Sequence, residues 1–386
     1  MLRRITLPAP RGAGEVPVAS IRLDQSIVRA LDELGATLPP TEFTRPLLDQ
    51  LAGAYATGRG MAEAFGRLLE QTLGPMGLVV FDSSDPAAKP LVKQVFVREL
   101  ETPGVSARLA AETGARLGDA GYHAQVTPVD GTVSLFHLDG GRQPIRTQAD
   151  ALSVGSASVP VSVLIAAAER EPHRFSPNVL LRPIVQDSLF PTVSYIAGPS
   201  ELAYLGQLRN VYEHFGVPMP IMYPRATATL LDSAAARFLT KYDAPLEQLR
   251  PRDEAALNRL LEAQLPASVE RAYEEAEAGL RVRMEALIAA VPAIDPTLEG
   301  AARSTLRKMQ HDLGSLRDKI IHGAKRRDDT LRRQFARTQA QSFPEGHPQE
   351  RAVGFVYFLN RYGPALIDRL SANLPVEPGT HWILTI

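Results

Sequence analysis

Cysteine is absent from the 386 residues of this chain, and long apolar runs are missing as well. The first absence excludes disulfide bonds, thiolate metal sites and a cysteine nucleophile, and it fits a reducing compartment. No window approaches the roughly 20 apolar residues that a membrane-spanning helix needs. The basic start, MLRRITL, is not followed by the apolar stretch of a secretory signal. We therefore expect a cytoplasmic protein without a membrane partner.

An excess of either charge is also missing, since the formal net charge is -1. Without a global basic field we do not expect nucleic acid as a partner. The sequence has no HExxH motif, Walker loop or GxGxxG, and its 8 histidines show no metal-ligand spacing, so we expect no metal site. What remains is a chain that is 45% hydrophobic and long enough for one large core and a smaller unit.

Residues 1–250 carry the pattern of an α/β domain. Apolar residues follow helical spacing over 46–73, up to Gly74-Pro75, and again over about 88–120. Between them, the apolar run 77–82 ends on Asp82, as a buried parallel strand does. A meander is expected over 123–147, and a helix from Pro160 to Arg170.

The stretch from 193 to 223 predicts a βαβ unit. Val193–Ala197 forms a strand candidate, Gly198-Pro199-Ser200 the turn, and 201–215 a helix closed by Gly216. Residues 220–223 supply a further short strand. Strand, glycine turn, helix and strand favour a Rossmann-like core with a largely parallel sheet over residues 1–250.

Residues 251–340 read instead as an antiparallel coiled coil, with a break at 291–296. From 253 to 285 there are 8 acidic and 4 basic residues, and from 301 to 337 there are 4 acidic and 11 basic. An antiparallel hairpin sets these charges against each other. We expect the hairpin to form a homodimer, because its outer sides stay apolar, and the tail 341–386 to return to the core. The seams are Val269, Tyr273, Ala276, Leu280, Met284, Leu287 and Val291 on the first helix, and Met309, Leu313, Leu316 and Ile320 on the second.

The turn 198–200 is a candidate ligand site. Ligands bind at the carboxyl ends of parallel strands, and the free N–H groups of a helix start favour an anion. Ser200 is a candidate N-cap. Glu201 is expected to face the same opening, at the carboxyl end of the strand, which we call the mouth of the site. Tyr204 and Gln207 are spaced to line it, and Arg225 follows the next strand. The alternative is an ordinary capped turn, with packing or surface roles for the other side chains.

A second candidate lies in 175–187, where prolines alternate with polar residues. Rigid loops of this kind suit recognition, and Arg182 has the geometry to hold a carboxylate or phosphate. Ser176 and Asn178 belong to the same stretch. The alternative is an Asx turn at Asn178 and a surface ion pair at Arg182.

The segment FSPNVLLRPIVQDSLFPTVSYIAGPSELAYLGQL, residues 175–208, resembles the bacillithiol biosynthesis cysteine-adding enzyme family, which is named as a cysteine ligase family. The stretches 74–82, 217–225, 343–351 and 362–363 are similar too. The resemblance implies a Rossmann-type core, an antiparallel coiled coil, and the joining of cysteine to glucosaminyl-malate as the last step of bacillithiol synthesis. It also implies binding of an adenine nucleotide, ATP or ADP.

One departure from the family concerns the start of the chain. Members carry a further N-terminal segment with a Gly-Gln-Gln-rich loop, whereas residues 2–8 here resemble an internal strand. We therefore expect an incomplete core that does not add cysteine by itself. The rival hypothesis is a non-catalytic dimeric scaffold that binds a small anion. The catalytic base is unassigned, and the expected substrate-binding residues are Ser176, Asn178, Arg182, Gly198, Ser200, Glu201, Tyr204, Gln207 and Arg225.

Overall fold

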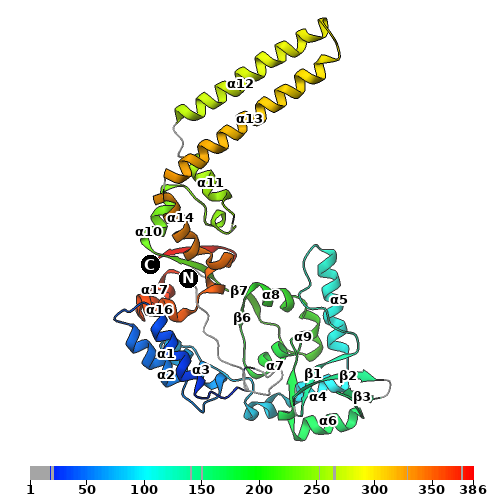
Figure 1. The fold of residues 1–386 in the computed structure, drawn as a ribbon. Coiled ribbons are helices and arrows are strands. Elements are labelled where there is room, and N and C mark those ends of the chain that lie inside the picture. The colour runs from blue at the N-terminus through cyan, green and yellow to red at the C-terminus, as the bar shows by residue number, and fades with distance from the viewer. Residues whose placement is uncertain are drawn as a thin grey trace. The chain divides into compact units, whose positions relative to one another are not determined.

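The computed structural model describes residue 18 and residues 21–139, 141–148, 151–251, 253–263, 267–327, 329–374 and 377–386. The strand-like residues 2–8 lie outside these ranges. The described chain divides into a larger unit, up to residue 226 with 359–380, and a smaller unit, 227–358 with 381–386. Figure 1 shows the elements of both. No helix of the described residues is long and apolar enough to cross a bilayer.

The larger unit begins with a group of helices that the chain's tail joins. The helical stretch expected over 46–73 is two helices, which separate at Tyr55 and end at Gly74. Asn360 of the tail connects the tail to these N-terminal helices, because its Nδ2 donates to the carbonyl of Pro39 at 2.9 Å. Gly363 has φ +72°, and a Cβ there would lie 2.6 Å from the Phe43 ring, so only glycine fits. The helices are α1 (Ser26–Thr37), α2 (Thr44–Ala54), α3 (Met61–Leu73), η2 (Gly74–Met76), α17 (Ala365–Asn373) and, from Leu359 on, α16 (Phe355–Tyr362).

An antiparallel sheet of five strands, in the order β4-β3-β2-β1-β5, forms the main core of this unit. The meander was correctly placed, and helix α6 begins directly after Pro160 as expected. The single helix predicted over 88–120 is instead η3, α4 and α5, because Thr102, Pro103 and Gly104 interrupt it. The strands are β1 (Thr132–Leu138), β2 (Arg142–Gln148), β3 (Ala151–Val154), β4 (Ala157–Val159) and β5 (Phe175–Pro177). The helices are η3 (Pro86–Val92), α4 (Lys93–Glu101), α5 (Val105–Asp119), α6 (Val161–Arg170) and η4 (Pro172–Arg174).

The predicted βαβ unit is present beside this sheet. Strands β6 (Ser194–Ala197) and β7 (Ile221–Pro224) pair in parallel, with Ser194 opposite Ile221. The helix expected over 201–215 is broken into α8 (Pro199–Leu205) and α9 (Arg209–Phe215), and Gly216 closes it with φ +66°. Helix α7 (Arg182–Leu189) precedes β6. Parallel pairing in this unit is confined, among the described residues, to β6 and β7, so the expectation of a largely parallel sheet was too broad.

The strand expected over 77–82 does not form. Val79 is 86% exposed, and Leu78 and Phe81 are exposed as well. The Phe81 ring meets the Phe190 ring edge-on, with ring centroids 5.0 Å apart. A strand needs a ladder partner for its backbone, and no described strand pairs with this run. The apolar pattern of residues 77–82 was therefore insufficient to predict a strand.

The smaller unit is built on a second parallel pair, β8 (Thr227–Leu231) with β9 (His381–Thr385). The end of the chain thus supplies a strand of this unit. Gln349 holds β8, because its amide exchanges hydrogen bonds of 2.8 Å with both backbone groups of Leu230. Asp232 caps the next helix by accepting from Ala235 N at 2.9 Å. The helices are α10 (Ser233–Lys241), η5 (Leu246–Leu249), α11 (Ala255–Glu262), α14 (Asp329–Ser342), η7 (Pro344–Gly346) and α15 (Gln349–Ala352).

A helical hairpin completes the smaller unit. Helices α12 (Ala267–Ala290) and α13 (Leu298–Arg327) run side by side and are joined through η6 (Val291–Ala293), as Figure 1 shows. Arg317 of α13 crosses to Glu270 of α12 at 3.2 Å, so the expected charge pairing occurs. The antiparallel coiled coil is thereby confirmed.

The heptad seams were placed less accurately. Leu287 and Ile320 are 52% and 36% exposed, whereas their neighbours Ile288 and Ile321 are each 5% exposed. Straight helices with 3.6 residues per turn drift from a strict heptad, which moves the facing position by one residue. Five predicted seam residues are exposed: Ala276, Leu287, Met309, Leu316 and Ile320.

The boundary between the units falls between Ala226 and Thr227, whereas the sequence placed 227–250 with the core. The tail divides as well. Residues 359–380 belong to the larger unit, as expected of the whole tail, but β9 pairs with β8 in the smaller unit. Backbone pairing over 150 residues of separation is invisible to local periodicity.

Candidate functional site

Arg182 is the centre of the polar cluster at the carboxyl end of β6. It is the first residue of α7, and its guanidinium Nη2 donates to the hydroxyl of Tyr204 on α8. The same nitrogen lies 3.6 Å from Glu201 Oε1, and the two side chains are 43% and 45% exposed. The cation is thus held at a surface, with only a loose carboxylate partner.

Two tyrosines affect the charge of this arginine. Tyr195 of β6 and Tyr204 are 9% and 7% exposed. The Tyr204 hydroxyl accepts a hydrogen bond from the Arg182 guanidinium, and both tyrosines raise the pKa of Arg182 and so favour its charged form. Burial raises the pKa of Tyr204 to about 12, so the phenol stays protonated at neutral pH. The arginine is therefore positioned by the neutral hydroxyl of Tyr204, and its charge remains available.

The start of α8 differs from the expected anion mouth. Its N-cap is the buried Gly198, not Ser200, which is the second helical residue and is exposed. The Glu201 carboxylate folds back and accepts from Gly198 N at 3.3 Å. This is a capping box, in which the helix's own carboxylate occupies the place where an anion would bind. We correct the role of Ser200 accordingly.

Asn178 and Ser176 mainly support the structure of the loop before α7. Asn178 Oδ1 accepts from Leu180 N at 2.9 Å and from Leu181 N at 3.2 Å, which is the Asx-turn alternative. Ser176 lies on β5, opposite Phe136 of β1. Both side chains are half-buried. The loop orients the start of α7, and through it Arg182.

Gln207 was placed wrongly at the mouth. It is 0% exposed, in the link between α8 and α9. Its Nε2 donates to Val126 O at 2.9 Å, and its Oε1 accepts from Val126 N at 3.0 Å. The one-turn spacing from Tyr204 failed because the helix breaks at Gly206, which turns the side chain into the core. Through these two hydrogen bonds, Gln207 holds the segment before β1 against the link between α8 and α9.

Arg225 lies where the parallel pair ends. Its backbone N donates to Ala197 O at 2.8 Å, and its side chain is exposed. It follows β7 directly, so it stands at the same sheet end as Gly198. The structure thus groups Arg182, Glu201 and Tyr204 with the backbone of Gly198, and leaves Ser200 and Gln207 outside the cluster.

Sequence reasoning overlooked Tyr195 and Tyr212 next to this cluster, whereas Asp187 belongs to the candidate stretch 175–187. Tyr212 of α9 donates to Asp187 Oδ2 at 2.6 Å, and burial followed by this bond raises the pKa of Tyr212. Tyr195 was within reach of the sequence, because period-two alternation puts it on the buried face of β6 with Ala197. The Tyr212–Asp187 contact joins two helices and had no local signal.

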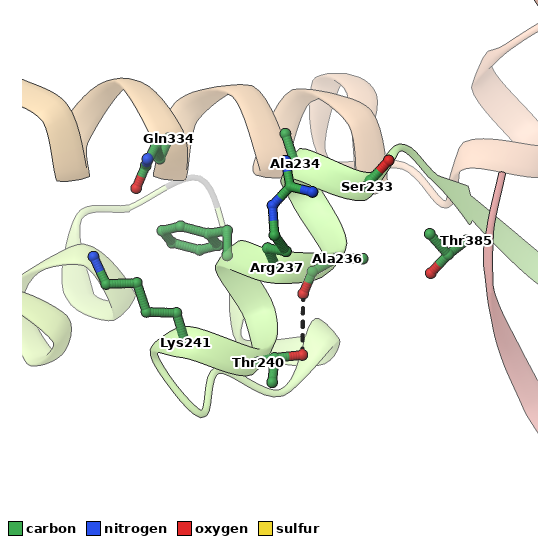
Figure 2. Close-up of a pocket in the computed structure, with 9 residues that line it drawn as sticks. Ser233, Ala234, Ala236, Arg237, Thr240, Lys241, Gln334 and Thr385 are labelled. Carbon is green, nitrogen blue, oxygen red and sulfur yellow. Dashed lines mark hydrogen bonds between the residues drawn. The ribbon is translucent and has the colours of Figure 1, made fainter.

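A separate groove of about 640 Å³ lies in the smaller unit, between α10 and α14. Figure 2 shows Arg237 and Lys241 on one side of α10, with Gln334 of α14 across from them. The floor includes the buried Phe238. Arg237 and Lys241 are exposed cations one turn apart. Among the described residues no group of three or more acidic or histidine side chains is placed to hold a metal ion.

The geometry at Arg182 suits an anion that replaces the loose Glu201 contact. Charge-assisted hydrogen bonds of a guanidinium to a carboxylate are directional and can be bidentate. Tyr204 and Tyr195 supply further hydroxyls within the same cluster. The chemistry of this arrangement suits a carboxylate or phosphate, and no group in it is placed as an evident nucleophile.

Comparison with known proteins covers the whole chain. The model of the bacillithiol biosynthesis BshC N-terminal Rossmann-like domain matches residues 2–226, and that of the BshC C-terminal coiled-coil domain matches residues 228–386. A Salinibacter ruber protein named "Putative cysteine ligase BshC" is 32% identical over 373 residues, which cover 96% of this chain and 68% of that protein.

Further relatives carry the same name. The protein of Koribacter versatilis is 33% identical over 371 residues, covering 96% of this chain and 69% of its own length. That of Chlorobaculum tepidum is 30% identical over 393 residues, covering 97% and 69%. The two family models meet at residue 227, where the structure also divides its two units. This chain belongs to the bacillithiol biosynthesis BshC family, with a Rossmann-like domain followed by a coiled-coil domain.

Proposed function

We propose that this protein is a ligase that joins the carboxylate of cysteine to the amine of glucosaminyl-malate, the last step of bacillithiol biosynthesis. Family membership along the whole chain supports the reaction class. The observation that carries the site is Arg182, hydrogen-bonded to Tyr204 and only loosely paired with Glu201. A carboxylate of the malate moiety takes the place of Glu201 on this guanidinium.

The reaction forms a C–N bond between the cysteine carbonyl carbon and the amine nitrogen of the sugar. The carbonyl must first carry a good leaving group, which departs with the bonding electron pair while the amine loses a proton. In this proposal Arg182 holds the acceptor's carboxylate and Tyr204, a neutral phenol, donates to it. These residues bind and orient the acceptor, and the base that takes the proton is not among them.

ATP is the proposed source of activation, because a nucleotide supplies the phosphate or adenylate that makes a carboxylate reactive. The start of α8 does not fit a phosphate chain, since Glu201 already accepts from Gly198 N. Arg237 and Lys241 in the groove of the smaller unit fit phosphates better, as two exposed cations beside an apolar floor. We propose this groove for ATP or ADP.

Binding of the acceptor tests the proposed site directly. Glucosaminyl-malate should raise the melting temperature of the 386-residue chain, because a ligand that binds only the native state stabilises it by mass action. Arg182→Ala should weaken this binding by about 1.5–3 kcal/mol, the range for a charge-assisted hydrogen bond. Arg209→Ala is the matched control, since Arg209 is an exposed arginine paired with Glu213 on α9.

Three results would contradict the site. The first is no thermal response to glucosaminyl-malate at millimolar concentration. The second is an equal loss in the Arg182 and Arg209 variants. The third is full retention of binding by Arg182→Ala. Mass-spectrometric detection of bacillithiol after incubation with cysteine, glucosaminyl-malate and ATP tests the reaction itself.

A second proposal is a homodimer through residues 253–340, which also serves the rival scaffold function. Met309, Leu316 and Ile320 are 42%, 52% and 36% exposed along α13, spaced 7 and 4 residues apart. That spacing sets them along one side of the helix. Light scattering at micromolar concentration should give twice the 42.0 kDa of one chain. Leu316→Asp should yield monomers, and a dimer that survives this change would exclude the interface.

A further inference from the structure

Glu99 of α4 is a fully buried acid that lies outside the cluster at Arg182. Its Oε2 accepts from Ser106 Oγ of α5, and its Oε1 accepts from the backbone N of Ser134 on β1 at 2.6 Å. Both serines are 0% exposed as well. The carboxyl group therefore joins α4, α5 and β1 at one point of the core.

The backbone of Ser134 needs this acceptor because β1 is irregular here. Thr132 is paired with Arg146 and Phe136 with Pro144, so β1 passes through 133–135 while β2 has a single residue between the same two pairs. In the described register Ser134 has no paired residue on β2 or β5. A buried N–H without an acceptor is costly, and Glu99 supplies the acceptor that the sheet does not.

Hydrogen bonds continue from Ser134 to the start of α7. Ser134 O accepts from Asn178 N at 2.9 Å, and Asn178 O accepts from Arg182 N at 3.0 Å. Asn178 Oδ1 also holds the turn between them by accepting from Leu180 N at 2.9 Å. Three successive hydrogen bonds thus connect the Glu99 carboxyl group with the backbone of Arg182.

The position of that backbone matters for anion binding. Charge-assisted hydrogen bonds of a guanidinium are directional, and they weaken when the donor and acceptor are misaligned. Arg182 is the first residue of α7, so a displaced turn displaces the point from which its side chain extends. Its half-exposed guanidinium is held on the other side by the Tyr204 hydroxyl. The fit to a ligand therefore depends on both the side-chain contact and the backbone support.

We propose that Glu99 is a positioning residue for the anion site at Arg182. It holds the irregular part of β1, and through Ser134 and Asn178 it fixes where α7 begins. Glu99 contacts no ligand in this role, because it is fully buried. The inference rests on the proposed function to the extent that Arg182 receives the carboxylate of the acceptor.

Calorimetric titration of the full chain with glucosaminyl-malate tests the proposal, at a temperature where each variant is folded. Glu99→Leu removes the acceptor of Ser134 N and should weaken binding by about 10-fold, the effect of a buried donor losing its partner. Glu99→Gln should bind within about 2-fold of wild type, because its amide Oε1 accepts from Ser134 N and its Nε2 donates to Ser106 Oγ.

A core variant of the same helix separates positioning from stability. Leu100, the next residue on α4, is 0% exposed and takes no part in the hydrogen bonds to Arg182. Leu100→Ala should lower the melting temperature by leaving a cavity, yet bind glucosaminyl-malate as wild type does. Should Glu99→Leu fail to fold, Glu99→Asp replaces it, since the side chain one methylene shorter keeps the charge and withdraws the acceptor.

Three results would overturn the proposal. They are wild-type affinity in the folded Glu99→Leu or Glu99→Asp protein, an equal loss of affinity in Leu100→Ala, and an equal loss in Glu99→Gln. Absence of binding by the wild type would instead reject the proposed ligand of Arg182. In that case amide hydrogen exchange decides the role of Glu99. The amides of Asn178 and Arg182 should exchange about 10-fold faster in Glu99→Leu than in Leu100→Ala, and equal rates would exclude the positioning role.

Discussion

The hairpin of the smaller unit and the core of the larger unit place charged residues in opposite environments. In the hairpin of the smaller unit, charges line the outside of α12 and α13, and the pair Arg317–Glu270 is 35% and 38% exposed. In the larger unit, Glu99 is fully buried and Lys89 nearly so. Exposed charges are solvated and contribute little, whereas a buried charge requires a partner or a changed protonation state. Ionisable groups therefore affect stability strongly where they are buried in the larger unit, whereas the exposed charges of the hairpin mainly adjust surface electrostatics.

The largest difference between the units should appear in their apolar positions. Phe96 is 0% exposed in the core of the larger unit, whereas Leu316 of the hairpin is 52% exposed. Phe96→Ala should cost about 3–5 kcal/mol, the range for a large core side chain that leaves a cavity. Leu316→Ala should change the free energy of unfolding by less than about 0.5 kcal/mol in a monomer. Urea denaturation followed by circular dichroism measures both, and similar costs would remove the contrast.

The buried acid should make the stability of the larger unit depend on pH. Glu99 accepts hydrogen bonds from Ser106 Oγ and Ser134 N, but burial dominates and raises its pKa from 4.5 to about 7. The folded state thus binds this proton more tightly than the unfolded state. The contribution is fully present below pH 4.5 and decreases as the pH rises to about 7. The loss is on the order of 3 kcal/mol.

Glu99→Gln tests this dependence, because the amide is neutral at every pH. The difference in unfolding free energy between wild type and variant should grow in the variant's favour from pH 5 to pH 8. Urea midpoints measured across this range give the slope. Parallel pH profiles for the two proteins would show that Glu99 is not the group responsible.

A smaller effect is expected at Gln207, which the structure assigns to the core and not to the ligand site. Gln207→Ala leaves Val126 N and Val126 O without their partner, and such losses cost about 1–3 kcal/mol. The binding constant for glucosaminyl-malate should be unchanged. A variant of normal stability with weakened binding would restore Gln207 to the site.

The smallest effect should come from the hairpin's ion pair. Arg317 and Glu270 are both partly exposed, and such pairs contribute about 0.2–1 kcal/mol. A double-mutant cycle with Arg317→Ala and Glu270→Ala measures the coupling energy. Arg317 also lies over the Tyr273 ring at 5.4 Å, so Glu270→Ala should cost less than Arg317→Ala. A coupling energy above about 2 kcal/mol would place this pair with the buried charges of the other unit.

The sequence by itself determined the elements whose pattern is local. Helical spacing, opposite charge and a central break were enough for the hairpin of α12 and α13. Turn residues were enough for the parallel pair β6–β7, and Arg182 was recognisable as a candidate anion-binding residue, although the structure places it at the start of α7 and not in a loop. These features depend on residues a few positions apart, where the period of the backbone fixes which side chains share a face.

Tertiary structure decided everything that depends on pairing across distance. The run 77–82 has the composition of a strand, yet it finds no partner in the described chain, while 381–385 pairs with β8 from more than 150 residues away. Because the helix breaks at Gly206, the side chain of Gln207 points into the core and not into the expected ligand site. The carboxylate of Glu201 folds back and accepts from Gly198 N, so it occupies the start of α8 where the sequence predicted a bound anion. Local pattern sets what an element can be, but the backbone and side-chain partners that satisfy it are chosen only when the chain is folded.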